Sequence, residues 1–323
     1  MVKQFSVIVA VYNAQNYLQE TLVSLQRQTY REFEVVMVDD GSTDQSAEIA
    51  RQFCISDPRF RLLSTPNRGI SPTRNLAIEH ARGDWLAICD ADDTWNPHKL
   101  EKQAAFIAAW DDRAHGPLAA LGTAGYITNR FGQVRRVEDL GITTLEDYRY
   151  WRDEIGQMAM INSSVVFRKD LFFEVGGYRA DYTPAEDTDL WTRLAGRGVV
   201  LNLPGRLTYY RMHGENISES SYVRMMLNAR RVRANSGRRR AGLPEYSYDE
   251  FYAHLAEHPE QLARLLRQLR HEMHYYVARN RWNNGRRLGG LGRFLRATLL
   301  APERSLRLLR EGYLHRLRRG QAA

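Results

Sequence analysis

Short apolar runs and amphipathic segments alternate over residues 5–89, and this alternation limits the possible folds more than any other feature. The apolar runs are rich in Val, Ile, Leu and Phe and are predicted to be β-strands, while the segments between them have helical spacing. Strand and helix in alternation imply a mostly parallel sheet covered by helices on both faces, an α/β fold. The predicted strands span 5–11, 34–38, 61–63 and 84–89, and a helix is predicted after Asn13, after Ser42 and over 72–81.

Residue types that cap helices mark two of these predicted helices. Asn13 precedes leucines at helical spacing, Ser42 precedes the next helix, and both types favour the N-cap position. Asp44 is then expected in a first helical turn, in a structural role. The opening run MVKQFSVIVAVYN soon reaches polar residues, so it is expected to form a buried strand and not a signal peptide.

Two acidic clusters directly follow predicted strands. Asp39 and Asp40 follow the second strand, and residues 90–93, with the sequence DADD, follow the fourth. In open α/β sheets ligands bind beyond the carboxyl ends of the parallel strands. Their position, as well as their composition, therefore indicates a binding site.

Tyr12 and Asp40 are candidates for holding a nucleoside. Tyr12 follows the first strand, where its ring can stack on a base, and Asp40 follows the second, where its carboxylate can accept from a base N–H or a ribose hydroxyl. A half-buried core tyrosine is the alternative for Tyr12. A plain surface turn is a poor explanation of residues 39–44, because three acids follow so apolar a strand.

Asp90, Asp92 and Asp93 form a cluster that suits a divalent cation. Mg²⁺ and Mn²⁺ prefer carboxylate oxygens and keep water and substrate phosphates in their other positions. Such a cation would neutralise charge on a leaving diphosphate. The alternative is an acidic loop that caps the helix near Asn96. Asp93 is the expected direct ligand, and Asp92 is expected nearer the ribose or diphosphate.

Three acids, Glu186, Asp187 and Asp189, open a later helix. Acids in a first turn complement the helix dipole, which is a sufficient structural reason for them. Transfer of a group to a hydroxyl nevertheless needs a general base to take the proton, and a partly desolvated carboxylate is a suitable type. Asp187 is the residue expected to take the proton.

Two further charged residues have alternative roles. Arg74 is expected either to contact a phosphate or to pair with an acid on the surface. His213 follows residues 206–209, an expected edge strand, and is a candidate metal or phosphate ligand, although a lone histidine is more often structural.

Together these residues resemble the family 2 glycosyltransferases of the GT-A fold. The matching tracts occur in the family's order and spacing and cover about residues 4–216. They are SVIVAVYN, VVMVDDGSTD, NRG at 67–69 with RN at 74–75, DADD, GGY at 176–178, ED at 186–187 and YRMH at 210–213.

The resemblance implies a Rossmann-like GT-A domain that binds a nucleoside-diphosphate sugar with Mn²⁺ or Mg²⁺ and inverts the anomeric carbon. It implies base catalysis by Asp187. It implies that Tyr12 and Asp40 contact the nucleoside and that Asp92 and Asp93 bind the metal and the diphosphate. Ala10 and Arg74 are further candidates for donor binding, and His213 is a further candidate metal ligand.

Processive polysaccharide synthases of this family usually carry a Gln-x-x-Arg-Trp motif and membrane helices, and neither is found after Asp187. Transfer of a single sugar to a glycan or lipid-linked acceptor, as in bacterial-type polysaccharide precursors, is therefore favoured. Two rival functions remain. A nucleotidyltransferase would normally have a Gly- and Lys-rich phosphate loop where YNAQN stands at 12–16, and a catalytically silent sugar-nucleotide-binding protein is the other.

The last third of the sequence has a different character. A catalytic domain over 1–217 and a helical region over 218–323 are expected, because strand patterns end near this boundary. Residues 279–323 hold 12 arginines, no lysine and two acids, a charge of +10, whereas the rest of the chain carries −2.

Apolar residues at helical intervals among these arginines are typical of helices that lie on an anionic membrane surface. The alternative is a solvated hairpin that packs on the catalytic domain or forms an oligomer contact. Nucleic acid is a disfavoured partner because no recognised binding motif accompanies the charge. The apolar residues are Leu288, Leu291, Phe294, Leu295, Leu299, Leu306, Leu309, Tyr313 and Leu317.

The two cysteines, Cys54 and Cys89, lack the spacing of a disulfide framework or a zinc site. No apolar stretch approaches the roughly 20 residues that span a bilayer. A cytoplasmic protein, peripheral at the inner face of the cell membrane if the arginine-rich tail binds lipid, is the expected setting.

Overall fold

The computed structural model describes residues 5–214, 216, 220–305 and 308. The chain divides into two compact units that are not continuous in sequence. The first comprises residues 1–128, 134–211 and 228–245, and the second comprises 129–133, 212–227 and 246–323. The expected boundary between residues 217 and 218 stays a prediction. Leu306, Leu309, Tyr313 and Leu317 of the predicted apolar set lie outside the described residues.

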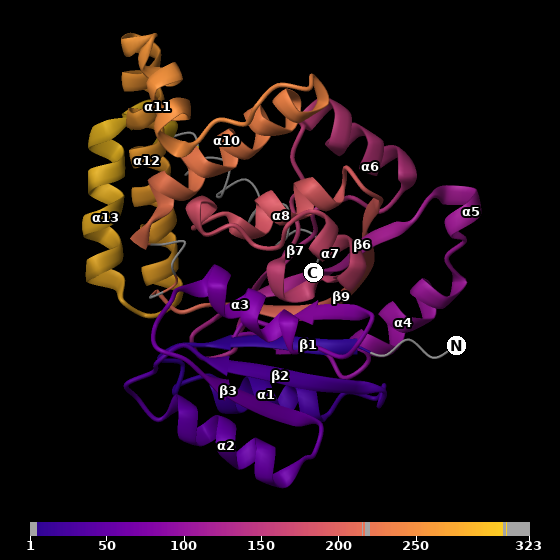
Figure 1. Cartoon of the computed structure of the whole chain (residues 1–323). Helices are drawn as coiled ribbons and strands as arrows, with labels where there is room; N and C mark the ends of the chain where they lie inside the picture. Colours follow the sequence, from indigo (N-terminus) through magenta and orange to yellow (C-terminus); the bar gives the residue numbers. More distant parts are fainter. Residues whose placement is uncertain (1–4, 215, 217–219, 306–307, 309–323) are drawn as a thin grey trace, which may run out of the picture. The chain divides into compact units, whose positions relative to one another are not determined.

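Among the described residues, one nine-stranded sheet has the order β3-β2-β1-β4-β8-β6-β9-β5, with β7 paired to β6 (Figure 1). The first four strands are parallel, and β8 is antiparallel to β4. The predicted α/β alternation is confirmed in this parallel half. The strands are β1 (Phe5–Val11), β2 (Phe33–Asp39), β3 (Phe60–Ser64), β4 (Trp85–Ile88), β5 (Thr94–Trp95), β6 (Leu118–Asn129), β7 (Val134–Glu138), β8 (Val166–Arg168) and β9 (Val199–Met212).

Helices cover both faces of the parallel half, which explains why its central strands β1 and β2 are almost completely buried. Every residue of β2 is buried. In Figure 1, α3 (Ile70–Glu79) lies above the strands and α1 (Leu18–Gln26) and α2 (Ser46–Ser56) lie below them, as right-handed crossovers require. The predicted apolar face of α1 is confirmed, since its leucines are buried.

The two predicted N-caps are wrong. α1 begins well after Asn13, whose Oδ1 instead accepts a hydrogen bond from the N–H of Thr43 at 2.9 Å. α2 begins after Ser42, whose Oγ accepts from the N–H of Asn13 at 3.0 Å. Asp44 precedes α2 and accepts from the N–H of Ser46 at 2.9 Å. These side chains tie the loop after β1 to the loop after β2, a long-range role that local propensity does not reveal.

The second half of the sheet is mainly antiparallel. Residues 206–209 do form a strand, but the prediction that it is an edge strand is wrong. They belong to β9, which is 14 residues long and lies between β6 and β5. Tyr209 of β9 pairs with Thr94 of β5. The helices of this half are α4 (Lys99–Ala109), α5 (Asp112–His115), α6 (Leu145–Tyr150), α7 (Lys169–Glu174) and α8 (Glu186–Leu194), with short turns at Trp151–Ile155, Asn162–Ser164 and Ala180–Tyr182.

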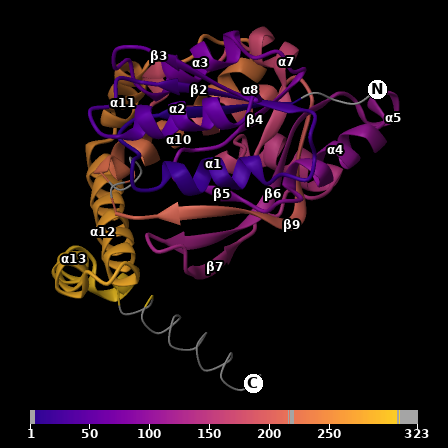
Figure 2. The same cartoon turned by 90° about the horizontal axis from the view of Figure 1, so that it is seen from below.

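Helices make up most of the second unit, which also contains the turn between β6 and β7 and the end of β9. α13 packs along α12 in both ribbon views (Figures 1 and 2). The two helices approach closely because Gly290 lacks a side chain: a Cβ there would lie 3.1 Å from the carbonyl oxygen of Ala278. In the described part of the chain, every helix is too short or too polar to cross a bilayer. The helices are α10 (Tyr222–Arg240, in the first unit from residue 228), α11 (Tyr248–Ala256), α12 (Pro259–Asn283) and α13 (Arg287–Leu300).

Candidate active site

The loops that follow β1, β2, β3 and β4 lie at one edge of the sheet because these four strands are parallel. Tyr12, directly after β1, is 52 % exposed, so much of its ring is accessible. Ala10 is half-buried and lies on the same face of the chain, two residues earlier. An exposed aromatic ring at this edge is available to stack on a planar base.

Asp40 is fixed by the loop that follows β3. Its Oδ1 accepts from the N–H of Arg68 at 2.8 Å and its Oδ2 from the N–H of Gly69 at 2.9 Å. The two loops meet at Gly41, which has φ +74° and where a Cβ would lie 2.9 Å from the backbone nitrogen of Asn67. Asp40 is therefore buried and held in one orientation, and only its remaining lone pairs are left for a ligand.

Arg74 is a buried cation that joins two distant acids. Its Nη2 donates to Oδ1 of Asp90 at 2.7 Å, and its Nη1 donates to Oε1 of Glu186 at 2.9 Å. Despite its burial, the charge of Asp90 raises the pKa of Arg74 above its ordinary value, so the guanidinium stays charged. Of the two roles expected for Arg74, pairing with an acid is the one observed, although inside the protein and not on its surface. Direct contact with a phosphate stays a prediction.

Asn162 was not identified from the sequence. Its Nδ2 lies 3.1 Å from Oδ1 and 3.0 Å from Oδ2 of Asp90. No local pattern marks this residue, because its role depends on a contact across 72 positions of the sequence. Together Arg74 and Asn162 hold the Asp90 carboxylate in place.

Asp93 is completely buried, at 0 % exposure. Its Oδ1 accepts from the N–H of Arg211 in β9 at 2.7 Å, and the Ser163 hydroxyl lies beside the carboxylate, whereas Oδ2 has no partner with hydrogen-bond geometry among the described residues. Burial, followed by the charges of Asp92 and Asp90, raises the pKa of Asp93 well above its usual range. The carboxylate form of Asp93 is therefore costly in the absence of a nearby cation.

A divalent cation fits these acids if the donor completes its coordination shell. Among the described residues, no three His, Cys, Asp or Glu side chains form a group that could hold a metal ion by themselves. However, Mg²⁺ is commonly bound by one or two carboxylates together with substrate phosphates and water. Asp92 is partly exposed, and Asp93 keeps an unpartnered buried oxygen. The direct ligation assigned to Asp93 and Asp92 stays a prediction.

The three acids that open α8 have different environments. Glu186 is paired with Arg74, and Asp189 is fully buried and accepts from Nε of Arg193 and of Arg179, each at 2.9 Å. Asp187 is half-buried and, within the described residues, has no hydrogen bond or ion pair with an arginine. Burial and the neighbouring charge of Glu186 raise the pKa of Asp187 to about 6.

The aromatic core holds α8 in position. Trp191 is fully buried, and its ring centroid lies 5.2 Å from that of Phe167 in β8. Because α8 is anchored there and at Arg74, its first turn is fixed next to the acids that follow β4. The structure thus brings Asp187 together with Asp90, which is close enough for its charge to act on Asp187.

His213 belongs to the second compact unit. Its backbone N–H donates to Oδ1 of Asn216 at 3.0 Å. Its assignment as a metal ligand stays a prediction.

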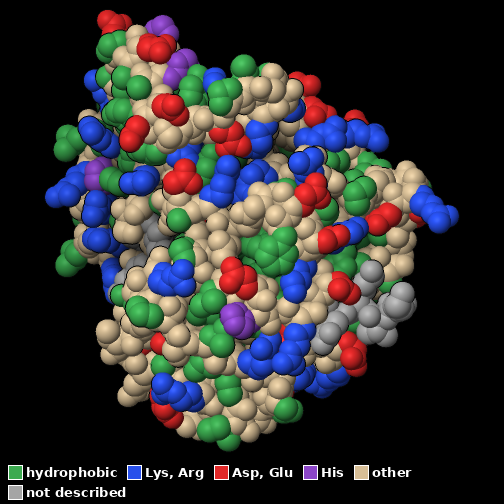
Figure 3. Space-filling model, viewed as in Figure 1, with side chains coloured by type: hydrophobic (Ala, Val, Ile, Leu, Met, Phe, Trp, Pro, Cys, Tyr) green, Lys and Arg blue, Asp and Glu red, His purple; other side chains and the backbone are tan. Residues whose placement is uncertain are grey.

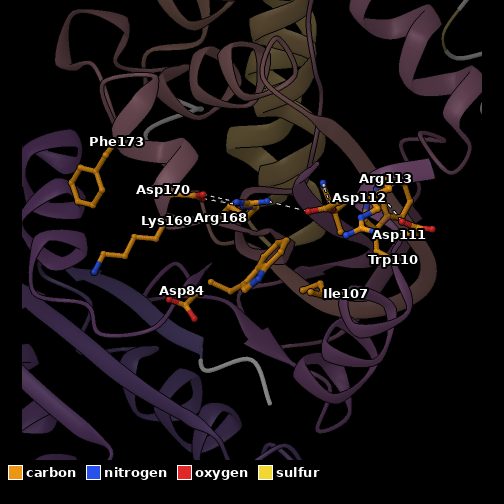
Figure 4. A pocket seen from close by; sticks show the side chains of 12 residues that line it. Asp84, Ile107, Trp110, Asp111, Asp112, Arg113, Arg168, Lys169, Asp170 and Phe173 are labelled. Atoms are coloured by element: carbon orange, nitrogen blue, oxygen red, sulfur yellow. Dashed lines mark hydrogen bonds and ion pairs between the residues drawn. The ribbon is translucent and has the colours of Figure 1, made fainter. Parts of the chain in front are cut away.

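A cavity of about 870 Å³ lies at the opposite edge of the sheet (Figure 4). It is lined by residues at the start of β4 and β6 and at the end of β8, such as Asp84, Leu118 and Arg168. In Figure 4, Arg168 points toward two acids. Its Nε donates to Oδ1 of Asp170 at 3.0 Å, and its Nη1 lies 3.4 Å from Oδ2 of Asp112. None of the predicted site residues is among those that line this cavity.

The sequence matches known proteins over much of its length. Residues 6–167 match the family model described as glycosyl transferase family 2. The chain is 29 % identical over 252 residues to the putative glycosyltransferase EpsE of Bacillus subtilis, covering 75 % of this chain and 85 % of EpsE. It is 42 % identical over 103 residues to an uncharacterized glycosyltransferase of Haemophilus influenzae, covering 32 % of this chain and 41 % of that protein. For the hyaluronan synthase of Pasteurella multocida, the match of 27 % spans 76 % of this chain and only 24 % of the synthase.

Solved structures share the fold at low sequence identity. S. aureus TarS 1–349 in complex with UDP-GlcNAc has a TM-score of 0.55 at 18 % identity, covering 92 % of this chain and 91 % of that one. The mannosyltransferase PcManGT of Pyrobaculum calidifontis, in complex with GDP-Man and Mn²⁺, has a TM-score of 0.54 at 18 % identity, covering 98 % and 81 %.

Proposed function

The chain belongs to glycosyltransferase family 2 and is a glycosyltransferase of the GT-A fold, and from this premise we propose that it transfers a single sugar from a nucleoside-diphosphate sugar to an acceptor hydroxyl, with inversion at the anomeric carbon. The observation that supports this most is the junction at Arg74. This one buried side chain joins Asp90, beyond β4, to Glu186, the neighbour of Asp187. Arg74 thereby links the acidic loop after β4, where the donor is proposed to bind, to the first turn of α8, which holds the candidate base.

Donor binding is assigned to the carboxyl edge of the parallel strands. The base would stack on Tyr12 beside Ala10, and Asp40 would accept a hydrogen bond from the base or ribose through its free lone pairs. TarS has been solved with UDP-GlcNAc and PcManGT with GDP-Man, so both uridine and guanosine donors are candidates. Asp92 is the acid we assign to the ribose or diphosphate.

A divalent cation, Mn²⁺ or Mg²⁺, is proposed as the cofactor. When bound, it would offset negative charge on the departing diphosphate. Asp92 would hold it from a partly exposed position. Asp93, whose Oδ2 is buried without a partner in the described part of the chain, is the proposed direct ligand. His213 is retained as a candidate ligand.

Asp187 is proposed as the general base. With a pKa of about 6 it is mostly ionised at neutral pH and is still more basic than an ordinary aspartate, which suits proton transfer near that pH. As the acceptor oxygen forms its bond to C1 of the sugar, its proton passes to Asp187. The bond from C1 to the phosphate oxygen breaks in the same displacement, and its electron pair leaves with the nucleoside diphosphate.

The acceptor is proposed to be a glycan or a lipid-linked glycan precursor. The absence of the Gln-x-x-Arg-Trp motif after Asp187 in the sequence favours one transfer per acceptor over processive synthesis.

Release of nucleoside diphosphate tests this function. The full-length protein is incubated with a panel of sugar nucleotides, with Mn²⁺, Mg²⁺ or EDTA, and with or without glycan acceptors. Release that needs a divalent cation and rises with acceptor supports the proposal. Release of pyrophosphate from a nucleoside triphosphate and a sugar phosphate would instead identify a nucleotidyltransferase. Donor binding without any turnover across the panel would identify a silent binding protein.

A further inference from the structure

One stripe of α13 exposes four leucines. Leu288, Leu291, Leu295 and Leu299 follow one another at intervals of three and four residues, so they lie on one face of the helix. They are 88 %, 49 %, 54 % and 85 % exposed. At the helical rise the stripe is about 16 Å long. Contiguous exposed apolar side chains of this kind mark an interaction surface.

The opposite face of α13 is already occupied. Ala297 is fully buried, and Gly290 lies against the backbone of α12. Phe294 packs against Tyr275 of α12 with ring centroids 6.3 Å apart. The helix therefore cannot turn its leucines inward without giving up this contact, and the stripe is a fixed outward feature of the α12–α13 hairpin.

Arginines flank the leucine stripe on both sides. At 100° per residue, Arg287 and Arg296 fall about 90° to either side of the stripe, and both are exposed. α13 contains no acid. Figure 3 shows the result over this helix, at the left margin of the view, where hydrophobic and basic side chains alternate. Trp282 at the end of α12 is also 56 % exposed, a residue type that favours membrane interfaces.

We propose that this surface of α13 binds an anionic lipid membrane, with the helix lying flat in the interface. The leucines would enter the acyl boundary while Arg287 and Arg296 remain at the level of the anionic headgroups. A second copy of the chain is a poorer occupant, because pairing two α13 stripes would bring arginines of both copies together. Binding of this kind is peripheral.

Vesicle sedimentation of the full-length protein tests the proposal. The vesicles contain phosphatidylcholine alone or equal parts of phosphatidylcholine and phosphatidylglycerol. The variant Leu288→Ser/Leu299→Ser removes the two most exposed leucines, and Ile55→Ser/Leu243→Ser removes two exposed apolar side chains elsewhere as a matched control. The variant Arg287→Gln/Arg296→Gln tests the charge. Thermal unfolding of each variant checks that the fold is kept.

The wild-type protein should pellet with the anionic vesicles and not with the neutral ones, and less so at high salt. The leucine variant should lose about tenfold in partition, the arginine variant should lose its preference for anionic lipid, and the control should behave as wild type. No pelleting of the wild type at low salt would overturn the proposal. Equal pelleting of the leucine variant would do the same. A wild-type dimer that the leucine change converts to a monomer, without an effect on pelleting, would make the stripe an interface between copies.

Discussion

Arginine is used in opposite ways in the two compact units. In the first unit, Arg74 and Arg193 are buried and each is paired with carboxylates of the candidate active site or of α8. On α13, Arg287 and Arg296 are exposed on a helix that contains no acid. Buried arginines neutralise and orient acids inside the protein, whereas the exposed ones leave their charge available to an outside partner. Charge alone therefore does not tell the two uses apart; burial does.

Asp187 is the acid that escapes this pairing, and its replacement should have the largest effect. Asp187→Asn should lower kcat by about 10²–10⁴-fold, because the acceptor proton loses its base. Donor affinity, measured by calorimetry with Mn²⁺, should stay within about twofold since Asp187 is not assigned to the donor. Asp170→Asn, an exposed acid that opens α7 at the opposite edge of the sheet, is the control and should keep wild-type turnover. An active Asp187→Asn enzyme would remove the base assignment.

The two classes of arginine should also differ in their effect on stability. Arg74→Met should lower the free energy of unfolding by about 3–5 kcal/mol, because Asp90 and Glu186 lose their cation in a buried setting. Arg296→Met should change it by no more than about 0.5 kcal/mol. Urea denaturation of both variants measures the difference. If both variants lost a similarly small free energy of unfolding, the buried and the exposed arginines would not differ in their contribution to stability.

Asp93→Asn should raise the free energy of unfolding and weaken metal-dependent donor binding. The folded-state pKa of Asp93 is raised above its unfolded value, so the negative charge that this carboxyl gains as the pH rises lowers the free energy of unfolding at neutral pH relative to acid pH. Removing that charge should raise the free energy of unfolding by about 1 kcal/mol. Metal-dependent donor binding should weaken by about tenfold, as expected for loss of one carboxylate that supports a cation. Calorimetry with and without Mn²⁺ measures the donor affinity, and thermal unfolding measures the stability. If donor binding by the variant depended on Mn²⁺ as in the wild type, Asp93 would not belong to the metal site.

The smallest expected effect is a shift of the pH profile. kcat/KM should rise with pH through about 6, because Asp187 accepts a proton only when ionised. Glu186→Gln should move this limb down by about one pH unit, since Glu186 raises the pKa of Asp187. Glu48→Gln, an exposed change on α2, should leave the profile in place. A limb that does not move in Glu186→Gln would assign it to another group.

Local sequence was sufficient for the parallel half of the fold. The runs 5–11 and 34–38 are mostly apolar on both faces, as expected for strands that are covered on both sides, and they form β1 and β2. Residues 206–209 are predicted to be an edge strand, but β9 lies between β6 and β5, which come from distant parts of the chain. Asn13 and Ser42 have the side chains of N-caps, and here they bind each other's loops instead.

For the candidate site, residue types were predictable and partners were not. The acids after β2 and β4 are visible in the sequence, as is Asp187. The bridge from Arg74 to Glu186 spans 112 positions, and no propensity encodes it. Asn162 stayed hidden for the same reason. Asp187 and Asp189 are the same residue type in the same helical turn, so the sequence does not show which one is accessible. Their difference in burial arises only when α8 packs against the core.

Hydrogen exchange with a bound nucleoside diphosphate is the most direct test of donor binding at the carboxyl edge of β1, β2 and β4. UDP and GDP are each added with Mn²⁺ to the full-length protein. We expect slower exchange at the backbone amides of residues 40–44, 67–70 and 90–93, and no change at 109–113 and 168–173 beside the cavity of Figure 4. Protection confined to those last two segments would contradict it.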